Sequence, residues 1–354
     1  MSGIEDKRKK IDELDKKVLE LLNSRTELIK DIAALKRKDG KAVFDPVREK
    51  QIVDKIVAEN KGRFPEKSLK LIFREMISAC RSLEDNLKIG FLGPETTFTH
   101  LAAIKQFGSE ANFVELDSIQ DVFAEVEKGH VNYGVVPIEN STEGTVTHTL
   151  DMFLDAGLKI SAEIRMNVKH SLLSKYKKEE IQKIYSHPQA LAQCRKYLAK
   201  NFPKAEIIEV ASTAKAAEAA SLYHSSAAIA SNLAARKYGL ETLDSGIEDS
   251  SSNKTRFLVI GKELNRSSGK DKTSIVYSVP HKSGSLHDSL GVLKKHGLNM
   301  TKIESRPSKN TNWEYVFFVD FEGHTEDEKV KKALEELQEH TQFLKILGSY
   351  PLVE

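Results

Sequence analysis

The sequence predicts a multidomain protein whose three parts differ in fold class: all-helical, then two-lobed α/β, then a smaller α+β part. Apolar residues near the N-terminus repeat at heptad spacing, which is typical of long paired helices. The middle of the chain alternates short apolar runs with amphipathic segments, and the C-terminal end contains two strand-helix-strand patterns. With 354 residues the chain is also too long for one ordinary core.

The first amphipathic segment, from about Ile4 to Lys36, predicts one long helix. Its apolar residues alternate by threes and fours, which places heptad a positions at 4, 11, 18, 25 and 32. One of these positions holds Arg25, and Lys36 lies eleven residues further on, about 20° round the helix. Two cations therefore face an apolar seam, where charges are rarely buried unless something pairs with them.

Two interpretations of these cations remain open at this point. A polar a-position residue can fix helix register or pair with an acid, whereas two cations can also hold a dianionic ligand between helices. Arg8 is 28 residues from Lys36, or roughly 42 Å along a straight helix, too far for one small ligand. If both serve one site, Arg8 must come from a second subunit.

Charge and cysteine content exclude several classes of protein. The 54 basic and 52 acidic residues are interspersed, so nothing suggests nucleic acid binding. No apolar run reaches the roughly 18 residues of a membrane span, and no signal peptide precedes the first helix. Two cysteines, Cys80 and Cys194, are too few for a disulfide framework or a zinc site. We expect a cytoplasmic, soluble protein that contacts no membrane.

Two further helices complete the N-terminal part, residues 1–87. Asp45-Pro46 predicts a capped helix start with proline in the first turn, and this helix runs to about Asn60. A third helix is expected from Pro65 to about Leu87. The first helix is too long to bury its seam within so small a unit, so it needs a partner, most simply its own copy.

Residues 88–264 show an α/β pattern with mainly parallel sheets. About 175 residues are generous for one sheet, so we expect two lobes with a cleft between them. Sites in such folds lie at the carboxyl ends of strands. Strands are expected at 88–92, 112–116, 133–137, 183–186, 206–210, 227–230 and 257–261, and helices at 191–201 and 213–221.

Residues 265–271 form a linker by composition, and residues 272–354 follow a βαββαβ order. That order is the split ferredoxin-like arrangement. Strands are expected at 273–279, 300–305, 313–321 and 343–349, and helices at 284–296 and 327–340.

Four polar stretches in the α/β part lie where strands begin or end. Free backbone N–H groups and hydroxyls at such positions can seat a carboxylate or phosphate. Each stretch alone is typical of a cap or a turn, but four of them in one unit suggest a ligand cleft. They are residues 93–100, 137–144, 186–190 and 250–257.

No competing chemistry is visible in the sequence. It contains no glycine-rich dinucleotide motif, no Walker lysine loop and no H-E-x-x-H motif. His148, His170 and His187 lack the spacing of metal ligands, and Cys194 lies inside an expected helix. We therefore expect neither a metal nor a cofactor.

Together these stretches resemble the bifunctional chorismate mutase–prephenate dehydratases, over essentially the whole chain. The helical part resembles the intertwined chorismate mutase dimer. The sequence motifs typical of the dehydratases are resembled by four stretches of this chain, residues 93–100, 137–144, 186–194 and 255–257. Residues 284–286 and 304–307 resemble an ACT regulatory domain. The resemblance implies a dehydratase shaped like a periplasmic binding protein. It also implies conversion of chorismate to prephenate and then phenylpyruvate, with feedback inhibition by phenylalanine.

The resemblance assigns roles in the helical domain. The rearrangement of chorismate is pericyclic, so the enzyme must hold a dicarboxylate and stabilise charge on the breaking ether oxygen. By resemblance, Arg25 and the partner subunit's Arg8 bind the carboxylates, with Arg48 nearby. Lys36 donates to the ether oxygen, and Glu49 holds the ring hydroxyl beside Asp45. Cys80 stands where better-known relatives have serine.

Glu84 departs from the family pattern, because some relatives carry glutamine there as a second donor to the ether oxygen. A carboxyl group can donate only when it is protonated. Burial beside an oxygen acceptor raises its pKa, whereas Lys36 lowers it.

The dehydratase removes carbon dioxide and hydroxide from prephenate, and aromatisation drives the reaction. By resemblance, Thr255 donates to the leaving hydroxyl, Arg256 grips a carboxylate, and Thr96, Thr97, Phe98, Asn140, Ser141, Thr142 and Phe257 complete the cleft. The set expected to bind phenylalanine is Gly284, Ser285, Leu286, Glu304, Ser305, Arg306 and Pro307.

Several alternatives stay open from the sequence. The helical domain could serve dimerisation alone beside an active dehydratase, or the whole chain could be a non-catalytic amino-acid sensor. Arogenate could replace prephenate as the dehydratase substrate. The assembly could be a dimer or a tetramer.

Overall fold

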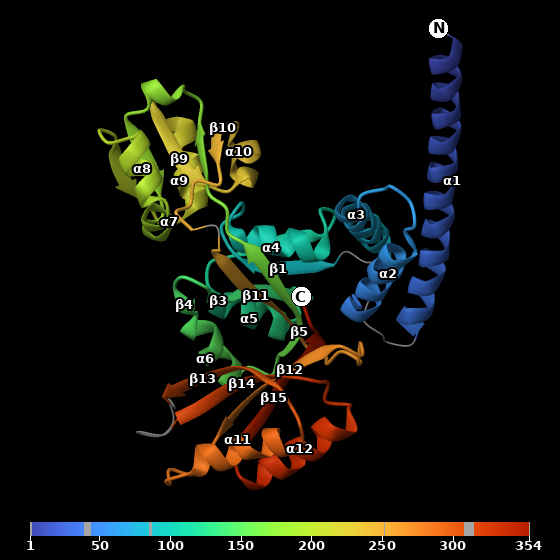
Figure 1. Cartoon of the computed structure of the whole chain (residues 1–354), viewed down its shortest axis with the longest axis vertical. Helices are drawn as coiled ribbons and strands as arrows, with labels where there is room; N and C mark the ends of the chain where they lie inside the picture. Colours follow the sequence, from blue (N-terminus) through green and yellow to red (C-terminus); the bar gives the residue numbers. More distant parts are fainter. Residues whose placement is uncertain (1, 39–43, 85–86, 251, 308–314, 354) are drawn as a thin grey trace. The chain divides into compact units, whose positions relative to one another are not determined.

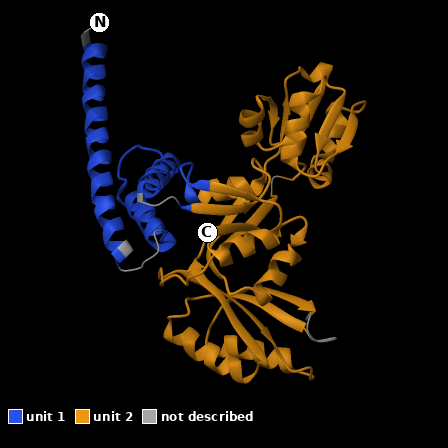
Figure 2. Cartoon of the chain, turned by 180° about the vertical axis from the view of Figure 1, so that it is seen from behind, with its two compact units in different colours: residues 1–87, 107–112 blue, residues 88–106, 113–354 orange. Residues whose placement is uncertain are grey.

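The computed structural model describes residues 2–38, 44–84, 87–250, 252–307 and 315–353. The chain divides into two compact units, residues 1–87 with 107–112 and residues 88–106 with 113–354 (Figure 2). Figure 1 labels the elements along the chain. Among the helices described, none has both the length and the apolar character that a membrane span requires.

Three helices build the first unit as predicted: α1 (Ser2–Lys38), α2 (Pro46–Glu59) and α3 (Glu66–Glu84). The heptad residues of α1 are exposed in the single chain, with Leu21 at 70% and Leu28 at 64%. Toward its C-terminal end α1 packs against α3, where Ala33 is buried. The carboxylate of Asp45 caps α2 by accepting a hydrogen bond from the Arg48 N–H (2.9 Å).

A six-stranded sheet, here called the first sheet, begins the second unit. Its order is β2-β1-β3-β11-β5, with β4 beside β3. β1 and β3 are parallel, whereas β11 runs antiparallel to both β3 and β5. Its strands are β1 (Lys88–Leu92), β2 (Asn112–Leu116), β3 (Tyr133–Asn140), β4 (Gly144–Thr145), β5 (Lys159–Asn167) and β11 (Lys254–Gly261), and its helices are α4 (Phe98–Phe107), α5 (Ile119–Lys128) and α6 (Thr147–Asp155).

The second sheet forms the other lobe, in the order β10-β6-β9-β7-β8. The chain enters this lobe after β5 and returns to the first sheet along β11, so two segments, residues 168–170 and 246–253, connect the lobes. Its strands are β6 (Ser171–Ser174), β7 (Lys183–Ser186), β8 (Glu206–Glu209), β9 (Ser226–Ala230) and β10 (Glu241–Ser245), and its helices are α7 (Pro188–Gln193), α8 (Arg195–Asn201), α9 (Thr213–Leu222), α10 (Asn232–Tyr238) and the 3-10 turn Lys178–Glu180.

The C-terminal sheet has the predicted split arrangement, in the order β13-β14-β12-β15. Its two helices cover one face (Figure 1), and residues such as Tyr277 and Phe321 form the core there. The opposite face packs on the first sheet, because Phe318 and Tyr350 share a hydrophobic cluster with Ile160 and Leu258. The elements are β12 (Asp271–Ser278), α11 (Ser285–Lys295), β13 (Met300–Pro307), β14 (Tyr315–Glu322), α12 (Glu328–Glu339) and β15 (Phe343–Pro351).

The α/β part differs from the expectation of mainly parallel sheets. Both sheets are mixed, since β6 also runs antiparallel to β9 and β10. Sequence patterning did not predict β5, β6 or β10; in β5 a carboxylate, Glu163, occupies a buried position and obscures the apolar run. The helix expected over residues 191–201 is two helices that meet at the buried Cys194.

The segment expected to be a linker is held by specific hydrogen bonds. The backbone N–H groups of Ser268 and Gly269 donate to the carboxylate of Asp271 at 2.8 and 3.2 Å. The amide of Asn265 donates to the carbonyl of Ser161 in β5 at 2.6 Å. This segment is therefore anchored to the first sheet.

Candidate active sites

Asn140 and Thr255 face each other at the carboxyl end of β3, where the antiparallel strand β11 begins. Nδ2 of Asn140 donates to Oγ1 of Thr255 at 2.7 Å and to Oδ1 of Asn253 at 3.0 Å. Its Oδ1 accepts from the backbone N–H groups of Thr142 (2.9 Å) and Glu143 (3.1 Å), which fixes the orientation of the amide. Because Thr255 Oγ1 accepts from Asn140, its own proton is available to another acceptor.

A chain of amides continues from this pair into the other lobe. Nδ2 of Asn253 donates to Oε1 of Gln193 (2.9 Å), and the same oxygen lies 2.9 Å from Nε2 of His170. Burial lowers the pKa of His170, so its ring is neutral and Nε2 carries the proton that it donates. In the described part of the chain, the buried Nδ1 of His170 has no hydrogen-bond partner.

The loop between β1 and α4 brings three more predicted residues close to these groups. Thr96 is buried and has a φ of 70°. Its carbonyl accepts a hydrogen bond from the Ser231 hydroxyl at 2.8 Å. Its side-chain Oγ1 has no hydrogen-bond partner among the described residues. Thr97 Oγ1 lies 3.5 Å from the carbonyl of Leu92. The ring of Phe98 meets His170 edge-on, with centroids 5.3 Å apart.

Ser141 and Thr142 support the start of β11 rather than standing apart from it. The Ser141 hydroxyl accepts from the Lys254 N–H at 2.9 Å, and Thr142 Oγ1 lies 3.5 Å from Oδ1 of Asn253. Phe257 is a fully buried core side chain. The structure thus brings the predicted threonines, serine and asparagine to one end of the first sheet.

Arg256 is the residue whose position differs from the expectation. It follows Thr255 on β11, so its side chain points to the opposite face of the strand. There Nη2 lies 2.6 Å from Oδ2 of Asp320 in the C-terminal sheet, and Nε lies 3.0 Å from Oε2 of Glu163 in β5. Its guanidinium is neutralised by buried acids and does not join the group around Thr255.

In the helical unit, Arg25 contacts α3 directly. Its Nη1 donates to the sulfur of Cys80 at 2.9 Å, and Cys80 itself is buried. Arg8 is exposed about five turns earlier on the same helix. Lys36 is half-buried near the C-terminal end of α1.

Glu49 has a partner that the sequence analysis did not name. Nη1 of Arg81 contacts its carboxylate, and Nη2 of Arg81 donates to the carbonyl of Phe107. Asp45 caps α2, and the side chain of Arg48 is exposed. The side chain of Glu84 lies outside the described residues.

The predicted C-terminal set separates into two groups. Gly284 (φ 89°) and Ser285 begin α11, and Leu286 packs against its core. On β13 the side chains alternate: Glu304 accepts from Thr145 Oγ1 of the first sheet (2.9 Å), and Arg306 lies 3.4 Å from Asp151. Ser305 and Pro307 are exposed on the other side of the strand.

Known proteins match this chain over all three parts. Residues 7–85 match the family model of chorismate mutase type II, residues 89–265 that of prephenate dehydratase and residues 273–339 that of the ACT domain. The bifunctional chorismate mutase/prephenate dehydratase of Aquifex aeolicus is 50% identical, covering 99% of this chain and 98% of that protein. This chain belongs to the bifunctional chorismate mutase/prephenate dehydratase family.

Further relatives agree with this assignment. The bifunctional enzyme of Pseudomonas aeruginosa is 43% identical over 97% of this chain and 96% of its own. The crystal structure of the prephenate dehydratase of Arthrobacter aurescens in complex with L-Phe is 32% identical, with a TM-score of 0.69, covering 75% of this chain and 90% of that one. The reading of the chain as a non-catalytic sensor is therefore set aside.

Three residues at these sites escaped the sequence analysis: Gln193, Asn253 and Arg81. Asn253 lies two positions before Thr255, inside the polar stretch 250–257, and Gln193 ends α7, a helix that begins inside the polar stretch 186–190. Neither carries a charge, so no pattern of charge or spacing marked them. Arg81 follows Cys80 on a helix face that only the packed structure buries.

Proposed function

We propose that Thr255 is the proton donor of the dehydratase step and that Asn140 holds it in the donating orientation. In this step prephenate loses its ring carboxylate as carbon dioxide, and the electron pair of that bond expels the ring hydroxyl. A proton delivered to that oxygen lets it leave as water, which leaves aromatic phenylpyruvate. The observation that supports this role is the 2.7 Å hydrogen bond in which Thr255 Oγ1 accepts from Asn140.

The buried groups without partners suggest where the substrate binds. Thr96 Oγ1 and the Nδ1 of His170 make no hydrogen bond within the described residues. A buried polar group without a hydrogen bond costs free energy, so such groups commonly bind a ligand or water. Thr97, Phe98, Ser141 and Thr142 complete this proposed substrate site. Arg256 is not part of this proposed site, so the carboxylate of prephenate that Arg256 was expected to bind must have another partner.

The mutase roles also remain proposals for this chain. Arg25 and the partner subunit's Arg8 bind the carboxylates of chorismate, with Arg48 nearby, and Lys36 donates to the ether oxygen. Glu49 holds the ring hydroxyl, and Arg81 positions Glu49 through the ion pair described above. Asp45, Cys80 and a protonated Glu84 line the same site.

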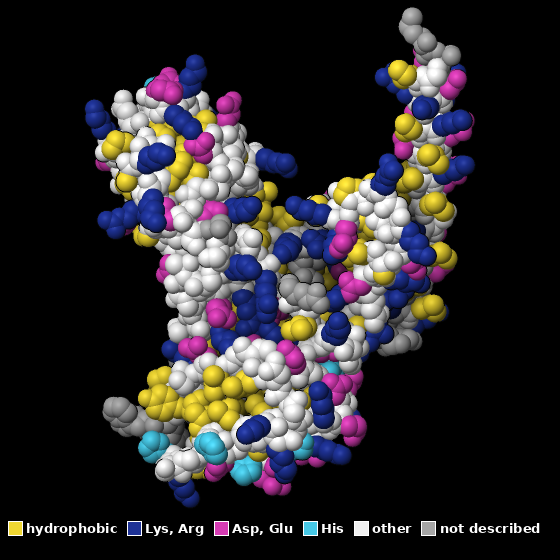
Figure 3. All heavy atoms as spheres, in the orientation of Figure 1, with side chains coloured by type: hydrophobic (Ala, Val, Ile, Leu, Met, Phe, Trp, Pro, Cys, Tyr) yellow, Lys and Arg dark blue, Asp and Glu magenta, His cyan; other side chains and the backbone are white. Residues whose placement is uncertain are grey.

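Regulation and assembly are also proposals for this chain. We propose that phenylalanine binds the ACT domain at Gly284, Ser285, Leu286 and the β13 segment 304–307, since a relative was crystallised with L-Phe. We also propose a homodimer or a pair of dimers in the cytoplasm. Figure 3 shows hydrophobic side chains gathered over β13 and β14, where Met300, Ile303 and Tyr315 are exposed, and further ones along α1.

The test of the dehydratase role compares Thr255→Ala with Thr255→Ser. Phenylpyruvate formation from prephenate should fall by about 10²–10⁴-fold in Thr255→Ala, which removes the donor, and recover partly in Thr255→Ser. The conversion of chorismate to prephenate should stay unchanged in both variants.

Each other outcome has a definite meaning. Dehydratase activity within threefold of wild type in Thr255→Ala would refute the role of Thr255. A wild-type protein that makes prephenate but never phenylpyruvate would refute the dehydratase proposal, and activity on arogenate alone would change its substrate. A protein that acts on prephenate but not on chorismate would leave the helical domain as a dimerisation element.

A further inference from the structure

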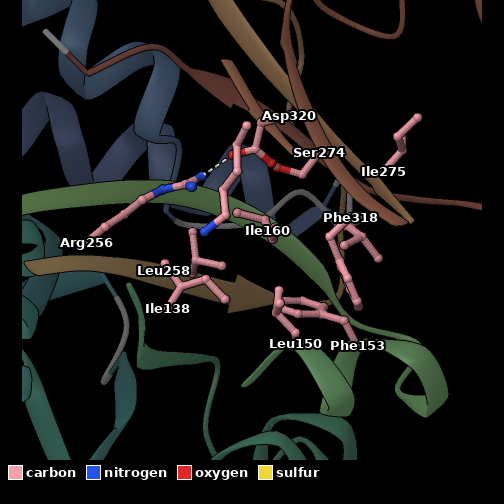
Figure 4. Close-up of a pocket in the computed structure, with 12 residues that line it drawn as sticks. Ile138, Leu150, Phe153, Ile160, Arg256, Leu258, Ser274, Ile275, Phe318 and Asp320 are labelled. Atoms are coloured by element: carbon pink, nitrogen blue, oxygen red, sulfur yellow. Dashed lines mark hydrogen bonds and ion pairs between the residues drawn. The ribbon is translucent and has the colours of Figure 1, made fainter. Parts of the chain in front are cut away.

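Arg256 lies at the centre of a cluster of charges between the first sheet and the C-terminal sheet (Figure 4). Its side chain is 12% exposed, and Nη2 donates to Asp320 (2.6 Å) and to the Tyr350 hydroxyl (3.1 Å). On the other side of the guanidinium lies the carboxylate of Glu163, which also accepts a hydrogen bond from Lys272 Nζ at 2.7 Å. Two of the three sheets therefore meet at one guanidinium.

The C-terminal sheet holds its side of this cluster rigidly. Oδ1 of Asp320 accepts from the Ser274 hydroxyl at 2.6 Å, and Ser274 lies 2.7 Å from the Tyr350 hydroxyl. Three adjacent strands, β14, β12 and β15, thus fix the carboxylate that binds Arg256. Burial alone would lower the pKa of Arg256, but Tyr350, Asp320 and Glu163 raise it above its ordinary value.

Stability alone does not account for so many charges at this position. Buried ion pairs rarely stabilise a fold more than apolar residues of the same shape would. A cavity beside the cluster is lined by Ile138, Leu150 and Phe153, so apolar packing was available there. The cluster does supply oriented hydrogen bonds that connect the C-terminal sheet to one strand of the first sheet, β11.

That strand carries Thr255 immediately before Arg256. The two residues share a peptide bond, and the register against β3 shifts just after Arg256, where the ladder is irregular. A displacement of the guanidinium therefore turns the backbone that carries the Thr255 hydroxyl. A misplacement of about 1 Å at a reacting group can cost about 10²-fold in rate.

We propose that Arg256 is a positioning residue that ties the ACT sheet, through Asp320 and Tyr350, to the Thr255 hydroxyl. This inference rests on the proposed role of Thr255. It gives the regulatory sheet a direct route to the catalytic strand: any motion of β14 and β15 relative to the first sheet is transmitted by the guanidinium.

The test uses Asp320→Asn in the full-length protein, with Lys345→Met as the matched control. The amide keeps the shape and can still accept from Ser274, but its NH₂ group then faces Arg256 and the ion pair is lost. Lys345 joins the C-terminal sheet to α6 of the first-sheet lobe, by donating to the carbonyls of Phe153 and Ala156 at 2.8 and 2.7 Å, and these contacts do not involve β11.

We expect the dehydratase kcat of Asp320→Asn to fall about tenfold with little change in KM for prephenate. Mutase activity should be unchanged. Calorimetry should show that phenylalanine still binds, while kcat with and without phenylalanine differs less than in wild type. Tyr350→Phe, which removes one acceptor, should show the same changes at smaller size, and Lys345→Met should show none.

Wild-type kcat and wild-type inhibition in a folded Asp320→Asn would overturn the inference. So would equal losses in Lys345→Met, because those would indicate a general loosening of the interface. If Asp320→Asn does not fold, Tyr350→Phe decides by the same criteria. A wild-type protein without dehydratase activity, or a Thr255→Ala variant with full activity, refutes the proposed function first and this inference with it.

Discussion

Asn140 illustrates, at the scale of a residue, how backbone groups set the direction of a side-chain hydrogen bond. Two backbone N–H groups occupy its Oδ1, so its NH₂ group must face Thr255 and Asn253. Thr255 is then an acceptor from Asn140 and, in the proposed dehydratase step, a donor to the substrate. The chemistry of the site depends on this polarity as much as on the presence of a hydroxyl.

Asn140→Asp tests that polarity with almost no change in shape. A carboxylate only accepts, so the Thr255 hydroxyl would donate to it instead of to the leaving group. We expect dehydratase kcat to fall by about 10²–10⁴-fold, the range for loss of general acid catalysis, with mutase activity unchanged.

The matched control is Asn132→Asp. Asn132 also accepts a backbone N–H, from Lys88 at 2.9 Å, but lies at the opposite end of β3 from Asn140. Its substitution should leave both activities intact. Dehydratase turnover of Asn140→Asp close to that of wild type would contradict donation from Asn140 to Thr255.

The contact of β15 with β5 shows, at the scale of the element, how closely the C-terminal sheet approaches the first sheet. A Cβ at Gly348 would lie 2.3 Å from the carbonyl oxygen of Ile160, so glycine is needed for two backbones to meet. Lys159 from the same strand donates to the carbonyl of Ile346 at 2.7 Å. In the interface that contains Arg256, the backbones of β15 and β5 are therefore in direct contact.

Gly348→Ala should separate these strands. We expect the free energy of unfolding to fall by about 1–3 kcal/mol, as for other overpacked cores, and phenylalanine inhibition to weaken. Chemical denaturation and dehydratase assays measure the two effects.

Gly291 provides the control, because a Cβ there would meet nothing within 4 Å. Since Gly291 lies inside α11, Gly291→Ala should raise stability by roughly 0.5–1 kcal/mol. Equal stability of Gly348→Ala and wild type would show that the two strands are not in close contact.

The exposed seam of α1 is the feature that matters most at the scale of the whole molecule. Its heptad residues, such as Leu21 and Leu28, are more than half exposed in one chain. Long apolar seams of this kind are normally covered by another helix. If Arg8 and Lys36 serve one mutase site, as proposed above, the distance between them requires that the site take residues from two chains.

Complementation tests this sharing directly. Arg8→Ala and Arg25→Ala should each abolish mutase activity. A hybrid dimer of the two variants contains one site with both arginines, so random mixing should restore about a quarter of wild-type activity. The measurement is prephenate formation after co-refolding equal amounts of both chains.

Lys16→Glu, at a heptad f position on the side of α1 away from the seam, is the control and should leave activity and dimerisation unchanged. Hybrid dimers that form, as judged by mass spectrometry of differently tagged chains, but remain inactive would show that both arginines act within one chain.

Local patterns in the sequence determined much of this protein. Heptad spacing predicted α1, Asp45-Pro46 predicted the start of α2, and the βαββαβ order predicted the C-terminal sheet. The polar stretches located Thr96, Asn140 and Thr255 near one another. These features depend on neighbours in sequence, or on the shared end of adjacent strands, so a pattern can reveal them.

The tertiary structure alone decided the direction of Arg256, the buried position of Glu163 and the contacts of Gln193 and Asn253. A strand presents alternate side chains to opposite faces, and only the packing of other elements determines which face is a cleft and which a core. Because the C-terminal sheet covers one face of β11, Thr255 is left at the site and its neighbour is bound between two sheets.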